Sequence, residues 1–387
     1  MPRQGAIINK PDAIRTALIF GGRSAEHDVS ILSARSVAGA ASRDRVEIVP
    51  LCMARDGRFI APERSARILA GEEKSPRGDD DFSFEIWLRT ASIDIVFPLI
   101  HGTGGEDGAL QGYLETIGVP YVGSGVTASA GGMDKVHMKQ AFAAAKLPMV
   151  DFVAVIENEW HNERERITRA VVNTLRLPYF VKPANSGSSV GVTKVKSDGD
   201  LARAIEFALR FDEKVLVERG IDAREIEVSV LGNEQPLASL PGEIMAGHEF
   251  YDYEDKYIDE KSQLIIPAKL PKEKIEEFRR LAVAAFKAVG ASGYVRADFF
   301  LERGTNRIFI NEINTIPGFT KISMYPKLWE ATEIKYSRLI ERLIELGLEH
   351  SRSRSARRQG AMEWLESAKP LEGKAEHVPT GGGGEVQ

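Results

Sequence analysis

Apolar runs alternate with helical patterns over the first part of the chain. Four short runs rich in Val, Ile, Leu and Phe lie at 16–20, 46–53, 93–100 and 119–123. Between the first two, DVSILSARSVAGAA places apolar residues three or four positions apart, which indicates an amphipathic helix. Strands that alternate with helices are typical of βαβ units, so we expect a mainly parallel sheet. The polar stretch 55–89, with its acidic GDDD, predicts surface loops and a hairpin.

A different pattern begins near residue 133. A helical segment at 135–146 precedes VKPANSGSSVGVTKV, which reads as two strands joined by a Ser/Gly loop. Further on, GYVRADFFL and RIFINEI are separated by the turn sequence LERGTNR, which favours a hairpin. The last helix is expected to end near residue 350, and the polar, glycine-rich segment 351–387 is expected to be mostly disordered. The predicted architecture is α/β with several domains, at 1–134, 135–232 and 233–350.

Composition narrows the class of protein. With 387 residues, 43% hydrophobic and 28% charged, the chain can build two or three globular domains. A net charge of −5 does not favour nucleic acid or an anionic membrane as a partner. The single cysteine, Cys52, excludes an intrachain disulfide framework. No apolar run reaches membrane-spanning length, so we expect a cytoplasmic protein.

The hairpin near the end of the chain carries candidate metal ligands. Arg296 and Asp298 share one face of the first strand by the period of two, and Glu312 and Asn314 share one face of the second. Two carboxylates and an amide oxygen are hard donors that suit Mg²⁺, best with substrate phosphates in the remaining positions. The alternative is a set of solvated strand charges, but the neighbouring residues are too apolar for an open edge. Zinc is disfavoured, because no two of the 7 histidines lie within four positions of each other.

Glycine-rich turns follow several of the predicted strands. The loop around Ser188 and Ser189, after Lys182, could hold an anion through its backbone N–H groups, although taken alone it is more often a plain turn. Glu26 follows Gly21-Gly22 and could complement a helix N-terminus or bind a substrate ammonium. His101 precedes another glycine loop at the rim where open α/β sheets bind ligands, and could equally be structural. The tyrosine-rich, acidic loop 248–261 is typical of a lid.

A series of motifs in this order resembles one enzyme family. The stretches are GGRSAEHDVS, HGTGGEDGALQG, GSGVTAS, MDK, VKPANSGSSVGVTKV, FYDYEDKY, RADFF and NEINTIPGFT. They are similar to those of the D-alanine–D-alanine ligases, which are ATP-grasp enzymes, and the resemblance covers about 14–349. It implies an ATP-grasp fold in which an N-terminal, Rossmann-like α/β domain binds the first D-alanine and two further subdomains clasp ATP.

The resemblance also implies roles for individual residues. The residues expected to contact ATP are Lys135, Lys182 and Ser189 at the phosphates, Glu218 at the adenine and Glu225 at the ribose. The residues expected to hold two Mg²⁺ ions, with Mn²⁺ as a possible substitute, are Asp298, Glu312 and Asn314. The residues expected to bind or orient the substrates are Glu26, His101, Ser188, Lys256, Tyr257 and Ser323. Arg296 and the Gly318 N–H are expected to stabilise an oxyanion.

The function implied is ATP-dependent joining of two D-alanine molecules through an acyl phosphate, with release of ADP and phosphate, for peptidoglycan precursor synthesis. The family also implies a homodimer. Tyr257 in EDKY favours an amine acceptor over D-lactate. Two alternatives stay open at this point: a D-alanine–D-lactate or other carboxylate–amine ligase of the same fold, and a catalytically silent ATP-binding regulator.

Overall fold

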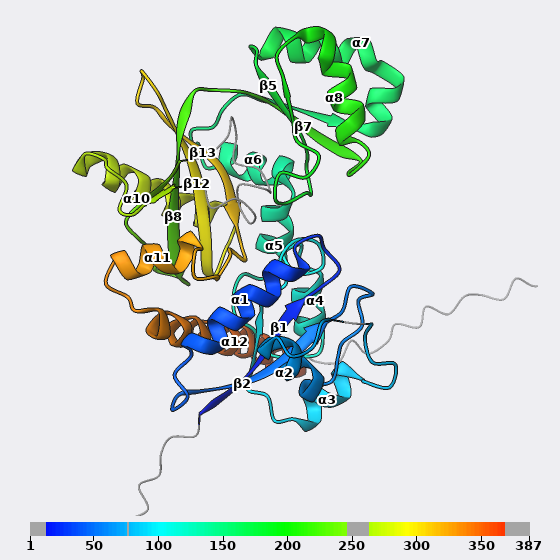
Figure 1. The fold of residues 1–387 in the computed structure, drawn as a ribbon, viewed down its shortest axis with the longest axis vertical. Coiled ribbons are helices and arrows are strands. Elements are labelled where there is room, and N and C mark those ends of the chain that lie inside the picture. Colours follow the sequence, from blue (N-terminus) through cyan, green and yellow to red (C-terminus); the bar gives the residue numbers. More distant parts are fainter. Residues whose placement is uncertain (1–12, 76, 246–262, 368–387) are drawn as a thin grey trace, which may run out of the picture. The chain divides into compact units, whose positions relative to one another are not determined.

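The computed structural model describes residues 13–75, 77–245 and 263–367 (Figure 1). The expected lid, with Lys256 and Tyr257, lies outside the described residues. Within the described ranges, no helix is long and apolar enough to cross a membrane.

The first sheet is parallel, as the alternating pattern predicts. Its strand order is β2-β1-β3, with β1 at Ile14–Gly21, β2 at Val46–Met53 and β3 at Ile95–Pro98. Helix α1 (His27–Ala40) connects the first two strands. The run expected to be a strand at 119–123 forms only one parallel bridge, between Tyr121 and Val96. Pro120 has no N–H to extend the ladder, and Gly118 and Gly123 have positive φ angles that turn the chain on either side.

Four further helices belong to this first part of the chain: α2 (Pro62–Ala70), α3 (Phe84–Thr90), α4 (Ala109–Thr116) and α5 (Val126–Met133). The hairpin expected within 55–89 is therefore wrong, apart from one bridge between Met53 and Phe59. Local signals start the two helices in this stretch. Pro62 occupies the first turn of α2, and the Ser83 side chain accepts a hydrogen bond from the Ile86 N–H at the start of α3.

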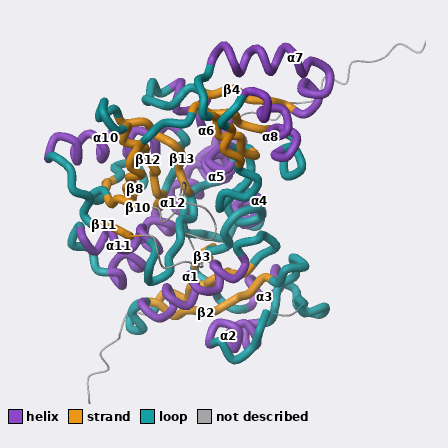
Figure 2. The backbone as a smooth tube through the Cα atoms, turned by 45° about the horizontal axis from the view of Figure 1, so that its top comes forward, coloured by secondary structure: helices purple, strands orange, loops and turns teal. Residues whose placement is uncertain are grey.

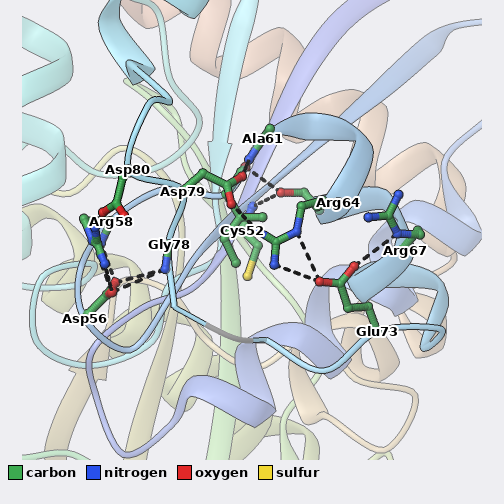
Figure 3. Close-up of polar contacts among 12 residues, drawn as sticks. Cys52, Asp56, Arg58, Ala61, Arg64, Arg67, Glu73, Gly78, Asp79 and Asp80 are labelled. Carbon is green, nitrogen blue, oxygen red and sulfur yellow. Dashed lines mark hydrogen bonds and ion pairs between the residues drawn. The ribbon is translucent and has the colours of Figure 1, made fainter.

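Arginines pair with two of the three aspartates in the acidic segment, Asp79 and Asp80 (Figure 3). Asp79 accepts a hydrogen bond from the Ala61 N–H at 2.8 Å and pairs with Arg64. Asp80 pairs with Arg58. Cys52 lies buried in the adjacent strand, where burial raises the pKa of its thiol to about 11, so a reactive thiolate is disfavoured.

The second sheet is antiparallel, with the order β4-β7-β5-β6. Its strands are β4 (Phe152–Ile156), β5 (Tyr179–Pro183), β6 (Thr193–Val195) and β7 (Lys214–Arg219). Strands β5 and β6 pair as the predicted Ser/Gly hairpin. Helices α7 (Glu157–Thr174) and α8 (Leu201–Ala208) bury apolar residues against one face, where alternate side chains such as Val181 and Val217 lie (Figure 1).

The third sheet contains the predicted metal-binding hairpin. Its path is β11-β10-β8-β12-β13, and β9 pairs with β8. The strands are β8 (Ala223–Gly232), β9 (Leu237–Ala238), β10 (Gly242–Met245), β11 (Gln263–Ile265), β12 (Gly293–Glu302) and β13 (Ile308–Asn314). Helices α6 (Lys135–Ala144) and α10 (Lys272–Ala288) pack in one apolar cluster with one face of this sheet (Figure 2).

The chain changes sheets between β7 and β8, at 220–222. Strand β8 pairs along its whole length with β12, so this change precedes the domain boundary expected at residue 232. The division of the chain into domains remains a prediction. Residues 1–350 form one compact unit.

The core of the first sheet includes residues from the other end of the chain. Phe319, Tyr325 and Trp329 belong to the same buried cluster as Leu18 and Phe97. Tyr325 and Trp329 lie on α11 (Met324–Ala331), and α12 (Tyr336–Ser367) adds the buried side chains Leu339, Ile340, Leu343, Ile344 and Leu346.

The expectation of a mostly disordered segment 351–387 is wrong for its first part, because α12 continues to Ser367, and 368–387 lie outside the described residues. The segment 351–367 is polar, but it contains no proline, and its four Arg, two Ala and two Glu are good helix formers that propagate a helix that has already formed. Its apolar side chains are exposed, with Trp364 at 68%. This extension is helical without being part of the core.

Removing residues 351–387 should leave the melting temperature nearly unchanged, because the helical residues lost bury little apolar surface. A deletion that begins after Arg338 should abolish cooperative unfolding. It removes four fully buried aliphatic side chains of α12, each contributing about 1.5–3 kcal/mol. Thermal unfolding followed by circular dichroism distinguishes the two deletions. A large loss of stability in the shorter deletion would contradict this account of α12.

Candidate active site

One cavity of about 1230 Å³ opens between the second and third sheets and the first glycine turn. The predicted site residues that the structure describes all line it: Glu26, His101, Lys135, Lys182, Ser188, Ser189, Glu218, Glu225, Arg296, Asp298, Glu312, Asn314, Gly318 and Ser323. Alternate side chains of a strand point to opposite faces of its sheet, which explains how polar residues reach the cavity while their neighbours stay in the core. In β8, Ile226 and Val228 face the apolar cluster, whereas Glu225 and Glu227 face the cavity.

The register of β12 and β13 brings the predicted metal donors together. Asp298 lies opposite Glu312, and Arg296 lies opposite Asn314. The Asn314 amide donates to the Asp298 carboxylate at 3.0 Å. An irregularity between Asp298 and Phe299 shifts the register by one residue, so the pairing beyond it follows another alignment. The sequence predicted this neighbourhood only to within a residue or two, and the structure confirms it.

These donors fit Mg²⁺. Asp298, Glu312 and Asn314 supply oxygen atoms without imidazole or thiolate, which is the chemistry that a hard cation requires. Among the described residues, no group of three or more His, Cys, Asp or Glu side chains is arranged to hold a metal by itself. Two carboxylates and one amide are consistent with this, because phosphate oxygens of a substrate would complete such a site.

Arg296 binds Asp298, one of the carboxylates that the metal would use, and also Glu227 beside it. Its guanidinium donates to both oxygens of Asp298, at 2.7 and 2.8 Å, and lies 3.0 Å from Glu227. Burial alone lowers the pKa of Arg296, but the two carboxylates outweigh burial and raise it well above its ordinary value. The arginine is therefore a permanent cation at the base of the cavity.

A buried charge cluster occupies the second sheet's inner face. The Glu218 carboxylate pairs with Lys182 of β5 and with Lys139 of α6. Burial raises the pKa of Glu218, but the two ammonium groups outweigh it and hold the pKa at about 2. The same environment lowers the pKa of Lys139, chiefly through burial. Glu218 was expected at the adenine, and here its carboxylate binds two lysines.

Sequence reasoning missed Lys139. Its side chain is only 1% exposed, in a helix whose neighbouring Val136, Met138 and Phe142 are buried. The signal was present: a lysine one turn after Lys135, among positions that the helical period assigns to the interior. A buried lysine requires a partner of opposite charge.

The Ser/Gly loop contacts the first glycine turn. The Ser188 hydroxyl donates to Glu26 at 2.5 Å. Ser188 and Ser189 both have positive φ angles, 49° and 60°, which non-glycine residues adopt rarely. The Lys135 ammonium donates to the Ser186 carbonyl at 2.7 Å. These contacts place the loop across the cavity from the metal donors.

His101 is 4% exposed, and both of its ring nitrogens have protein partners. Nδ1 donates to the Ile316 carbonyl at 3.0 Å, and Nε2 lies 3.1 Å from the Ser33 hydroxyl. The Glu106 carboxylate lies 3.8 Å from Nδ1. Burial lowers the pKa of His101, but Glu106 outweighs burial and raises it. The sequence predicted neither Ser33 nor Glu106 as part of this region.

Comparisons with known proteins agree with this geometry. Two family models match: "D-ala D-ala ligase N-terminus" over residues 15–124 and "D-ala D-ala ligase C-terminus" over 141–345. The D-alanine–D-alanine ligase of Halothermothrix orenii is 46% identical over 87% of this chain and 98% of its own length. That of Thermoanaerobacter sp. is 47% identical over 87% of this chain and 96% of its own.

Solved structures give the same result. The D-alanine–D-alanine ligase of Coxiella burnetii superposes with a TM-score of 0.79 at 33% identity, covering 92% of this chain and all of its own. The VanG D-Ala:D-Ser ligase of Enterococcus faecalis gives a TM-score of 0.75 at 31% identity, covering 87% of this chain. The chain belongs to the D-alanine–D-alanine ligase family and has its ATP-grasp fold.

Proposed function

We propose that this chain joins two D-alanine molecules to D-alanyl-D-alanine, consuming ATP and releasing ADP and phosphate. The observation that carries the proposal is the cavity that lysines of the second sheet, oxygen donors of the third and Glu26 line together. The product is a precursor for peptidoglycan. A cytoplasmic location and a homodimer remain predictions from the family.

ATP binds between the two sheets. Lys135 and Lys182 bind its phosphates, together with the loop that carries Ser189, and Glu225 on β8 binds the ribose. Segment 219–223, which links the sheets, lines the cavity and forms the hinge beside the adenine. Glu218 acts below the nucleotide by fixing the ammonium of Lys182, which its buried position supports.

Asp298, Glu312 and Asn314 would hold Mg²⁺, as two ions or with Mn²⁺ in its place. When bound, the metal spreads the negative charge of the transferred phosphoryl group. Arg296 keeps this cluster of carboxylates together, since without a cation their mutual repulsion is unfavourable.

The substrates bind near the first glycine turn. Glu26 binds the ammonium of the first D-alanine, and Ser188 holds the Glu26 carboxylate through its hydrogen bond. Ser323 binds the carboxylate of the second D-alanine. Lys256 and Tyr257, outside the described residues, are assigned to the transferred phosphate and to orientation of the substrates.

The reaction proceeds in two steps. A carboxylate oxygen of the first D-alanine attacks the γ-phosphorus of ATP, the bond to the β-phosphate oxygen breaks, and ADP leaves. The neutral amine of the second D-alanine then attacks the carbonyl carbon of the acyl phosphate. Arg296 and the Gly318 N–H stabilise the tetrahedral oxyanion, which collapses with loss of phosphate. Closure over the cavity keeps water from the acyl phosphate.

Release of ADP from ATP and Mg²⁺ tests the function directly. Strong release with D-alanine alone, and the dipeptide by mass spectrometry, are expected, whereas L-alanine should give none. Parallel reactions with D-alanine plus D-serine or D-lactate measure the choice of acceptor. If ADP were released only when a second, different acceptor is present, the protein would be a ligase of the same fold that uses another acceptor substrate. ATP binding without release under any condition would indicate a silent regulator.

Arg296→Ala should lower kcat by roughly 10²–10³-fold, because an oxyanion donor acts mainly in the transition state. ATP affinity should be retained, since no phosphate contact is assigned to this arginine. Steady-state kinetics with a separate ATP-binding titration make the comparison. Arg89→Ala, which removes an exposed arginine paired within α3, is the control. Near-normal turnover of Arg296→Ala would refute the oxyanion role.

Glu218→Gln should lose stability in a pH-dependent way. The folded-state pKa of about 2 lies below the ordinary value of 4.5, so ionised Glu218 stabilises the fold above about pH 4.5. This stabilisation declines as the pH falls from there through about 2. Urea unfolding at pH 7, 5, 4 and 3 measures the difference in the free energy of unfolding between wild type and variant. This difference should be constant down to about pH 4.5 and become smaller below it. The exposed Glu165→Gln is the control. A difference in the free energy of unfolding between wild type and Glu218→Gln that grew toward acid pH would contradict the assignment.

A further inference from the structure

The loop that carries Gly318 is fastened by residues distant in sequence. Gly318 lines the cavity, and Ile316 before it and Phe319 after it are both buried. The Ile316 carbonyl accepts a hydrogen bond from His101 Nδ1 at 3.0 Å. The Phe319 N–H donates to the Ser33 hydroxyl at 3.3 Å, and the Phe319 carbonyl accepts from the Tyr336 hydroxyl at 2.8 Å.

Ser33 and His101 also bind each other, which closes a ring of hydrogen bonds. A carbonyl can only accept, so Nδ1 of His101 carries the proton toward Ile316. Nε2 lies 3.1 Å from the Ser33 hydroxyl: it accepts from the Ser33 O–H in the neutral ring and donates to the Ser33 oxygen in the protonated ring, which Glu106 favours. In both states the Ser33 oxygen can accept from the Phe319 N–H.

Packing fixes the same loop from below. The Phe319 side chain is fully buried and meets four aromatic rings, with centroids 5.3 Å away at Tyr325, 5.6 Å at Tyr294, 6.1 Å at Phe97 and 6.4 Å at Tyr336. At Gly318 there is no room for a side chain, since an added Cβ would lie 2.8 Å from the Ser323 hydroxyl oxygen. The peptide N–H of Gly318 thus lies between two anchored residues.

We propose that Ser33, His101 and Tyr336 are positioning residues, which hold the Gly318 N–H where the oxyanion develops. His101 then acts through the loop and is not a ligand of a substrate carboxylate, because both of its ring nitrogens are already used. This inference rests on the proposed function, in which Gly318 is the oxyanion donor. It makes the N-terminal helix α1 part of the machinery for the second chemical step.

The physical reason is the geometry that an oxyanion donor requires. Such a donor works only if it is held in place before the charge develops, and small displacements weaken it strongly. Three contacts converge on the two residues that flank Gly318 from α1, from the loop after β3 and from α12. Hydrogen bonds between Ser33 and His101 could stabilise the fold without any contact to the loop that carries Gly318. Their attachment to this loop is what a positioning role requires.

Ser33→Ala tests the proposal, because it removes one hydroxyl and little volume. We expect kcat to fall roughly tenfold, a fraction of what deleting a donor costs, with the KM for each D-alanine and the Kd for ATP nearly unchanged. Inhibition by a phosphinate dipeptide analogue of the tetrahedral intermediate should weaken in parallel with kcat. The matched control is Ser65→Ala, another fully buried serine with two hydrogen bonds to backbone groups, distant from this loop.

His101 variants separate positioning from substrate binding. In His101→Asn the amide N–H can replace Nδ1 toward Ile316, so this variant should keep more of kcat than His101→Ala. A carboxylate ligand would instead give a raised KM for D-alanine in both variants, with kcat preserved, and that result would overturn the proposal. Tyr336→Phe, which loses only the hydroxyl, provides a third measurement if either other variant fails to fold.

The outcomes are distinguishable from failure of the proposed function. If the wild-type protein released no ADP with D-alanine, the function itself would be wrong, whatever the variants did. If the wild type were active and Ser33→Ala lost melting temperature as Ser65→Ala does, with kcat and phosphinate inhibition unchanged, the ring would be structural only and the inference would be refuted.

Discussion

The pairing of β12 with strands on both sides creates the electrostatic problem that the active site has to solve. In this register Asp298 lies between Glu227 on β8 and Glu312 on β13. Three carboxylates on one face of a sheet repel each other, and burial makes the repulsion stronger. Arg296, two residues away on the same strand, offsets part of it by binding two of the three. The remaining negative charge is what makes this face suitable for a cation.

The opposite sheet has the reverse arrangement. Glu218 pairs with Lys139 and Lys182, so one carboxylate is shared by two ammonium groups and the cluster keeps a net positive charge. A triphosphate with its metal matches both faces, since its phosphates meet lysines while the metal meets carboxylates. The third sheet has more carboxylates than cations, and the second has more ammonium groups than carboxylates. Both are therefore attracted to the same ligand, a triphosphate with its metal.

Much of this could be predicted from the sequence because it depends on local rules. The period of two placed Asp298, Glu312 and Asn314 on one face, and the turn between the strands brought them together. The contributions of Lys139 and Ser33 could not be read in this way, because their partners lie 68 residues or more away and depend on how elements pack. The helical end of the chain was missed for another reason: composition reports what a segment can bury, whereas a helix already begun at Tyr336 continues without burying anything.

The shared core beneath the first sheet has a consequence for how the chain is made. Leu18 and Phe97 pack with Phe319, Trp329 and the buried face of α12, more than two hundred residues later in the chain. A ribosome delivers the N-terminal strands first, so these strands leave the exit tunnel before the residues that cover them. Helices α1 and α2 cover part of this apolar surface, but the part that α12 covers stays without its native partner until α12 has been made. The region that the N-terminal family model matches can therefore complete its core only after the C-terminal helix has been made.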